Sequence, residues 1–129
     1  MRALAEGIVT RTSPHPASET LARLLALISK RSLTLFAVVD HSGAAAQAGT
    51  HLRETKLVIF GSPLGGTPAM ELVPTLALEL PLKVLIWEDD DAVRISYTSP
   101  SYLAARHGLP PELAAPFAGV EAIVEAVVA

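Results

Sequence analysis

The sequence predicts an α+β fold in which a mainly antiparallel sheet of about five strands has helices packed on one face. Strand-like and helix-like patterns alternate in the order β-α-β-α-β-α-β-β-α-α. A helix between strands can indicate a parallel sheet, but the expected helices at 41–48 and 67–73 are too short for standard parallel crossovers. The apolar runs at 80–88 and 92–99 are joined only by three aspartates, which predicts an antiparallel hairpin. The 129 residues are expected to form a single domain, 1–129.

The first part of the chain predicts a strand, a helix and a second strand. A β-capable segment at 4–12 is broken by Ser-Pro-His-Pro, and Ser18 is the expected N-cap of a helix over 19–30. One stripe of that helix is apolar and is expected to face the core: Leu21, Leu24, Leu25 and Ile28. The following run at 33–39 is apolar on both faces, which is typical of a covered or central strand.

Short capped helices are expected at the ends of the next strands. Asp40 should cap an Ala-rich helix that stops at Gly49, and the strand at 55–61 follows it. Thr67 before Pro68 predicts the start of a helix that Pro74 limits to about two turns. Ser99 or Ser101 should cap a short helix that ends at Gly108.

The C-terminal segment 110–129 predicts a terminal helix that Pro116 bends or restarts. Its apolar residues recur at helical spacing, so one stripe should pack inward: Phe117, Val120, Val124 and Val127.

Composition limits the possible functions. Half of the residues are apolar and 18% are charged, against roughly 25% charged in a typical domain. A small domain with so little charge is expected to place apolar surface in an oligomer interface or a ligand pocket. The net charge of −3, with ten dispersed basic residues, argues against nucleic acid or an anionic membrane as a partner.

The compartment is expected to be the cytoplasm. No cysteine is present, which excludes disulfides, thiol catalysis and cysteine-ligated metal. The N-terminal residues lack a long apolar signal region, and no stretch approaches the roughly 20 apolar residues that span a bilayer.

The stretch FGSPLGGTP at 60–68 approaches the pattern of a phosphate-binding loop. A phosphate loop needs a lysine after its last glycine, and Thr67 stands there instead. Pro68 also removes a backbone N–H that would face the anion. A strand-to-helix turn capped by Thr67 is therefore the favoured interpretation, with weak anion or small-ligand binding as the alternative.

Asp40, His41 and Ser42 contain the residue types of a hydrolytic triad, but neighbouring side chains in a strand point apart and do not converge. His41 is therefore expected to pack locally, or to line a pocket or metal site. His107 lies near an expected helix C-terminus, which favours a structural role. Four scattered histidines without metal-binding spacing predict no metal site, and no cofactor is assigned. The acidic run at 88–91 is expected to be a solvated turn.

Five stretches, in this order, resemble a bacterial and archaeal family catalogued as domain of unknown function 302: SETLARLLALI, DHSGAAAQAG, KLVIFGSPLGGTPAM, LPLKVLIWEDD and ISYTSPSYLAARHGL. The resemblance covers about residues 18–109. It implies a topology like that of the TATA-binding protein: a strand, a helix, four antiparallel strands and a final helix, with short extra helices here. It also implies homodimers, and it supplies no activity. Residues 30–32 depart from the glycine usual in the family, which should alter only a turn.

These observations together predict a homodimeric small-molecule-binding protein without demonstrated catalysis, whose pocket is bordered by 40–42, 61–70 and 97–107. Two alternatives remain: an enzyme that uses His41 or His107 as acid–base with Ser42 or Tyr102 assisting, and a purely structural or regulatory interaction domain. The expected partners are a second copy of the chain and a small-molecule ligand. The candidate binding residues are Asp40, His41, Ser42, Gly66, Thr67, Met70, Tyr97, Tyr102 and His107.

Overall fold

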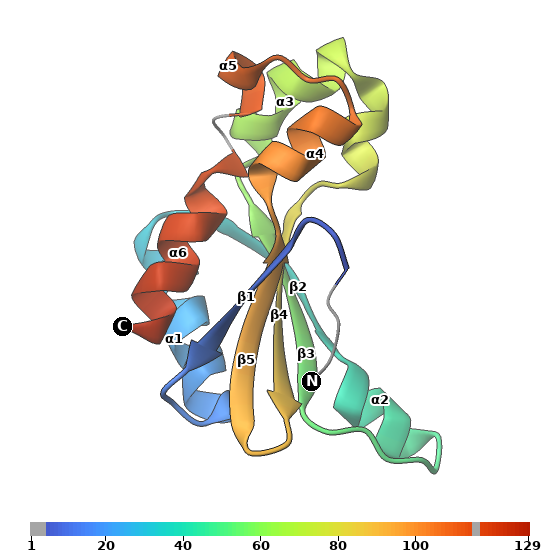
Figure 1. Ribbon diagram of the computed structural model, residues 1–129, viewed down its shortest axis with the longest axis vertical. Coiled ribbons are helices and arrows are strands. Elements are labelled where there is room, and N and C mark those ends of the chain that lie inside the picture. The colour runs from blue at the N-terminus through green and yellow to red at the C-terminus, as the bar shows by residue number, and fades with distance from the viewer. Residues whose placement is uncertain (1–4, 115–116) are drawn as a thin grey trace.

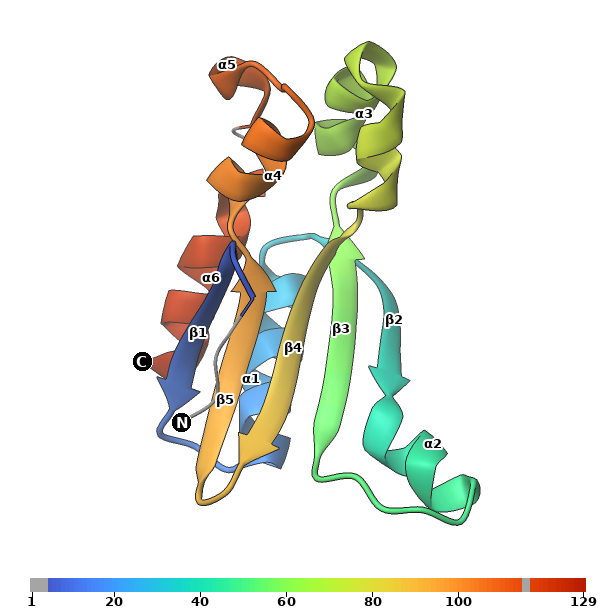
Figure 2. The same cartoon turned by 45° about the vertical axis from the view of Figure 1, so that its right-hand side comes forward.

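A five-stranded antiparallel sheet forms the body of the protein in a computed structural model that describes residues 5–114 and 117–129. The strand order across the sheet is β1-β5-β4-β3-β2 (Figures 1 and 2). The strands are β1 (Ile8–Ser13), β2 (Thr34–Asp40), β3 (Thr55–Gly61), β4 (Leu82–Asp89) and β5 (Ala92–Thr98). The helices are α1 (Ala17–Lys30), α2 (His41–Gln47), α3 (Pro63–Leu72), the 3₁₀ helix η1 (Pro74–Leu78), α4 (Pro100–Arg106), α5 (Pro111–Ala114) and α6 (Gly119–Val128).

The order of these elements confirms the predicted α+β class and topology. β2, β3, β4 and β5 follow one another as antiparallel neighbours, and β1 pairs with β5 at the far edge. The expected hairpin forms between β4 and β5, with only Asp90 and Asp91 in its turn. The short helices α2, α3 and α4 are excursions between strands or after them, so they do not make the sheet parallel.

The main core lies between one face of the sheet and two helices, α1 and α6 (Figure 2). The expected apolar stripes account for it: Leu24 and Ile28 of α1 are 0% and 2% exposed, and Val124 and Val127 of α6 are 1% and 0% exposed. Every second residue of β3, β4 and β5 points to this face and completes the core: Val58, Phe60, Val84, Ile86, Ile95 and Tyr97.

Four of the remaining helices, α3, η1, α4 and α5, extend the sheet at one end, and we define them as the helical cap. It lies where β3 and β5 end and β4 begins (Figure 1). It has a small core of its own, formed by Ala69, Leu76, Ala104, Leu109 and Phe117. Among the described helices, α1 and α6 therefore cover the face of the sheet, whereas the helical cap covers its end.

The prediction that the run at 33–39 is covered on both sides is wrong. β2 is an edge strand, and all seven of its residues are exposed. An apolar run shows only that both faces of a strand avoid charge. It does not show what lies beside the strand, so an interior strand and an unpartnered edge strand look alike in sequence.

Two predicted helix starts are also displaced. Thr67 is not an N-cap: α3 begins four residues earlier, at Pro63, with Ser62 as N-cap accepting a bond from the Gly65 N–H. Ser18 lies inside α1, which begins at Ala17 after Pro16. In both places a proline with a fixed φ lies at the helix start: Pro63 is the first residue of α3, and Pro16 is the N-cap of α1. The expected bend at Pro116 lies outside the described residues, and α6 begins at Gly119.

Candidate functional site

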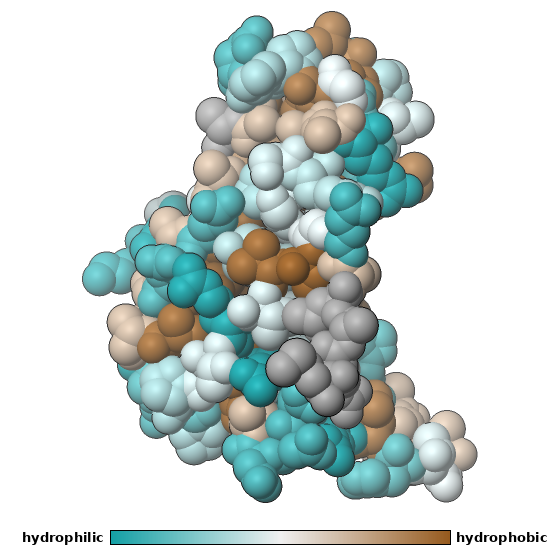
Figure 3. Space-filling model, viewed as in Figure 1, coloured by the Kyte–Doolittle hydropathy of each residue, from teal (hydrophilic) through white to brown (hydrophobic). Residues whose placement is uncertain are grey.

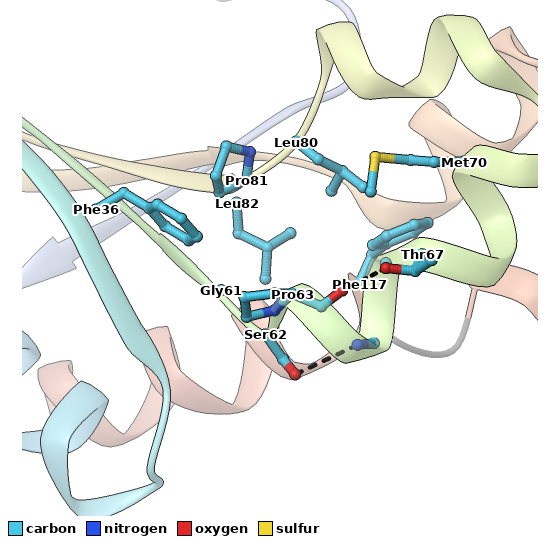
Figure 4. Close-up of a pocket in the computed structure, with 12 residues that line it drawn as sticks. Phe36, Gly61, Ser62, Pro63, Thr67, Met70, Leu80, Pro81, Leu82 and Phe117 are labelled. Atoms are coloured by element: carbon cyan, nitrogen blue, oxygen red, sulfur yellow. Dashed lines mark hydrogen bonds between the residues drawn. The ribbon is translucent and has the colours of Figure 1, made fainter.

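An apolar cavity of about 310 Å³ lies at the junction of the sheet and the helical cap. Figure 4 shows its walls, which come from the end of β3, the first turns of α3 and the segment that leads into β4. Phe36 of β2 and Phe117 contribute aromatic rings from two further directions. The lining residues are Phe36, Gly61, Ser62, Pro63, Gly65, Gly66, Thr67, Met70, Leu80, Pro81, Leu82 and Phe117.

The local sequence explains why these segments meet. In the antiparallel ladder Phe60 pairs with Leu82, so the last residues of β3 lie beside the first residues of β4. Ser62 and Pro63 then turn the chain directly into α3, as a cap and a residue suited to the first helical position. Gly66 has no side chain to fill the space beside Leu80: a Cβ there would lie 3.1 Å from the Leu80 Cδ1.

The lining contains no charged side chain, and its two hydroxyl groups already have local partners. Ser62 Oγ accepts a hydrogen bond from the Gly65 N–H at 3.3 Å. Thr67 Oγ1 donates to the Pro63 carbonyl oxygen at 2.7 Å (Figure 4). Among the described residues, no buried side-chain nitrogen or oxygen lacks a hydrogen-bond partner. The cavity is therefore suited to apolar contact and not to an anion, in agreement with the missing lysine.

Three of the nine candidate binding residues line this cavity, namely Gly66, Thr67 and Met70. The others lie elsewhere, and the prediction that 40–42 and 61–70 border one pocket is wrong. β2 and β3 are antiparallel, so Asp40 pairs with Lys56 at the start of β3 and Thr34 pairs with Gly61 at its end. A whole strand length separates the 40–42 segment from the cavity.

At that far end, Asp40 performs the capping role expected of it. Its Oδ1 accepts hydrogen bonds from the Gly43 N–H at 2.9 Å and from the Ser42 hydroxyl at 2.8 Å. These bonds, the backbone one first, lower the pKa of the Asp40 carboxyl below its usual value. The Ser42 hydroxyl also accepts a bond from the Thr55 N–H, which ties the start of α2 to β3. His41 is the exposed first residue of α2.

The two candidate tyrosines have packing roles. Tyr97 is 7% exposed within the main core, and burial raises the pKa of its hydroxyl. Tyr102 packs its ring against Gly7, just before β1. Neither lines the cavity.

His107 belongs to a polar cluster on the helical cap that the sequence did not indicate. Its Nε2 lies 2.7 Å from Glu79 Oε2, and its Nδ1 lies 3.2 Å from Thr75 Oγ1. The His107 hydrogen bond lowers the pKa of the Glu79 carboxyl, and the nearby Arg106 acts in the same direction. Glu79 and Thr75 lie 28 and 32 residues before His107 in the chain, so no local sequence pattern indicated this cluster.

Hydroxyl, imidazole and carboxylate stand here in the order of a hydrolytic triad. The cluster does not line the cavity, however, and it joins η1 and the residue after it to the end of α4. His41 and His107 lie at opposite ends of the sheet (Figure 1). We therefore assign the cluster a structural role.

Removing the charge of Glu79 should make the free energy of unfolding of the protein less dependent on pH. Because its pKa is lowered on folding, ionised Glu79 stabilises the fold at pH values above its ordinary pKa of 4.5, and this contribution is lost as pH falls through the lowered value. We expect Glu79→Gln to be less stable than the wild type near neutral pH, with the difference closing in acid. Urea unfolding at a series of pH values measures the difference in free energy of unfolding between the two proteins. Glu71→Gln, at an exposed position of α3, is the control. A constant difference across the series would contradict the prediction.

Within residues 5–114 and 117–129, no three histidine, aspartate or glutamate side chains are grouped so that they could hold a metal ion. In the same residues, no helix has the length and apolar character needed to cross a bilayer.

Comparison with known proteins identifies the family to which this chain belongs. The model of the family described as Domain of unknown function DUF302 matches residues 9–127, more than the 18–109 expected from the sequence. The chain belongs to the DUF302 family. Its fold also matches the crystal structure of an uncharacterized conserved DUF302 protein from Bacillus stearothermophilus, with a TM-score of 0.79 and 15% identity over 96% of this chain and 97% of that one. This likeness confirms the DUF302 fold.

Curated relatives of this DUF302 chain are named as fluoride channels. The chain is 39% identical over 104 residues to a protein named fluoride-specific ion channel FluC 1 from Brucella suis biovar 1. It has the same identity to FluC 2 from Brucella melitensis biotype 1. The match covers 80% of this chain but 41% and 38% of those relatives, so the chain spans about 40% of their length.

Proposed function

We propose that this DUF302 chain acts as a homodimer that binds a small, uncharged and mainly apolar molecule in the cavity between β3, α3 and β4. The observation that carries the proposal is the lining, in which aromatic, aliphatic and glycine residues surround about 310 Å³ without a single charge. Ligand cavities in proteins are predominantly apolar and usually range from about 300 to 1,000 Å³. The low charged content of the chain supports the same proposal.

The chemistry of the walls defines the ligand class. Transfer of apolar surface from water stabilises by about 25 cal/mol per Å². A charged ligand would instead lose its hydration without meeting an opposite charge, because the Ser62 and Thr67 hydroxyls are the polar side chains of the lining. Aliphatic alcohols and alkylbenzenes are therefore suitable probes.

Filling the cavity should abolish binding. Thr67→Phe places a ring where a lining side chain now stands, so an added alcohol or alkylbenzene should no longer stabilise the protein. Leu64→Phe adds the same ring at a solvent-facing position of α3, because Leu64 is 88% exposed. Thermal unfolding with and without saturating probe measures the effect. We expect the melting temperature of wild type and Leu64→Phe to rise by about 3 °C or more, and that of Thr67→Phe to stay unchanged.

A probe that stabilises Thr67→Phe as much as the wild type binds elsewhere and overturns the assigned site. If no member of the panel stabilises the wild type, the proposal of a small-molecule site fails.

A second candidate, a regulatory or interaction domain, is favoured by the curated relatives. In them the matched segment is part of a longer protein that carries a channel name. This candidate needs no ligand, so absence of stabilisation by the whole probe panel favours it over the first.

A further inference from the structure

β2 leaves one edge of the sheet apolar and without a neighbour within the described chain. Eight large apolar side chains are exposed within residues 5–114 and 117–129, and four of them lie on this strand: Leu35, Phe36, Val38 and Val39. By contrast, the face shown in Figure 3 has apolar residues only in separate patches among hydrophilic ones.

Natural edge strands are usually protected by lysine, proline or charge, because their unpaired backbone groups can add a further strand. From Thr34 to Val39, β2 contains no lysine, no proline and no charge. Its one protective feature is a shift of register between Leu35 and Ala37, and the strand pairs regularly from Ala37 to Asp40. β2 therefore has the composition of a strand that acquires a neighbour.

We propose that this neighbour is β2 of a second copy, paired antiparallel, and that the second copy closes the open side of the apolar cavity. The proposal rests on the function proposed above, and it adds which edge forms the dimer and how the dimer is linked to the ligand. A two-fold axis perpendicular to the sheet produces this antiparallel pairing, with the same residues contributed by each copy.

The charges at the two ends of β2 favour a second copy as the occupant. Asp40 ends the strand, and the exposed Arg31 lies shortly before its start. Antiparallel pairing brings Asp40 of each copy towards Arg31 of the other, so both ends of the interface join opposite charges. Lys56 Nζ lies 3.7 Å from Asp40 Oδ1 but 2.5 Å from Glu54 Oε2. Because Lys56 is shared between two carboxylates, it does not neutralise the charge of Asp40 by itself. A parallel pairing would instead bring like charges together.

Phe36 connects this edge to the cavity. It lies on β2, at the register shift, and its ring forms one wall of the cavity, facing Leu82 in Figure 4. Phe36 is also 49% exposed, so this wall is open towards solvent. Any antiparallel register that pairs most of β2 lays the second copy alongside Phe36. Ligand binding and dimerisation should therefore strengthen each other by the same factor.

Sedimentation equilibrium over a range of concentrations tests the interface. We expect the wild type to dimerise and Val39→Lys to raise the dimer dissociation constant by about tenfold or more, because the two-fold axis buries the lysine twice. Leu78→Lys is the matched control: it removes an apolar side chain that is 79% exposed on η1 and should leave the constant unchanged. A wild type that is monomeric at every concentration, or a folded Val39→Lys with the wild-type constant, overturns the proposal.

Amide hydrogen exchange of the unmodified chain gives a second test that does not depend on a variant folding. Amides of β2 should exchange more slowly at concentrations where the dimer forms, whereas those of the exposed η1 should not change. Equal exchange in β2 at low and high concentration overturns the assignment of β2 as the interface.

The link to the ligand is tested with 1-octanol. Saturating 1-octanol should lower the dimer dissociation constant of the wild type by about threefold or more, and that of Thr67→Phe should not respond. If 1-octanol raises the melting temperature but leaves the constant unchanged, the link fails and the binding function stands. If neither responds and the wild type still dimerises through β2, the binding function fails while the interface stands.

Discussion

Phe60→Ala should lower the free energy of unfolding by about 3–5 kcal/mol, the largest loss we expect from a single truncation. Phe60 is 0% exposed in the main core, on the face of β3 that α1 and α6 cover. Removing its ring eliminates buried apolar contacts and leaves a cavity that close-packed neighbours cannot refill. Urea unfolding followed by circular dichroism measures the loss.

Phe36→Ala is the control for this prediction. It removes the same ring from β2, but the Phe36 side chain is already 49% exposed. Its truncation should reduce the stability of the monomer by less than about 1 kcal/mol. Equal losses for the two variants, at a concentration where the chain is monomeric, would show that the burial of Phe60 does not determine its effect.

Gly7→Ala should destabilise the protein by about 2–5 kcal/mol, for two separable reasons. Gly7 has φ +81°, a left-handed conformation that costs a residue with a Cβ about 1–2 kcal/mol. The added Cβ would also lie 2.6 and 2.7 Å from Cδ2 and Cδ1 of Tyr102, so the ring must move. The Gly7 carbonyl accepts a bond from the Ser99 N–H at 2.7 Å, so displacement here also disturbs the start of α4.

Gly49→Ala separates the two reasons, because Gly49 has nearly the same φ, +83°, with nothing within 4 Å of the added Cβ. It should show only the conformational part, about 1–2 kcal/mol. The double variant Gly7→Ala, Tyr102→Ala should be less destabilised than the sum of its single variants, because the collision is gone. Additive losses would contradict the assigned role of Tyr102 as a packing partner.

The prediction of Asp40 as a cap was correct, and of the two caps predicted for α4 the structure uses Ser99 and not Ser101. Capping depends on residues three positions apart in the chain, which a sequence shows directly. The Thr67 cap was wrong because Ser62 and Pro63 offer the same capping residue and proline earlier in the chain, and α3 begins there. Local rules thus identified the helices but could not choose between two neighbouring starts.

The candidate site was harder to predict because it is assembled by pairing between strands. Gly66, Thr67 and Met70 were found because they lie in one segment that follows a strand. Phe36, Leu82 and Phe117 were missed, since they join the cavity only through the β2–β3–β4 ladder and the path of the chain into α6. Asp40 was wrongly predicted to line the same pocket as residues 61–70. Because β2 runs antiparallel to β3, Asp40 lies at the other end of the sheet.

The sequence by itself determined the five strands, most of the helices, the antiparallel hairpin and the apolar stripes of α1 and α6, because these follow from periodicity and from contacts between near neighbours in the chain. Only the tertiary structure decided that β2 lies at an edge, that His107 pairs with Glu79, and that the cavity lies beneath the helical cap. These features depend on which distant segments become neighbours. Strand order and register set that arrangement, and no local pattern of residues encodes it.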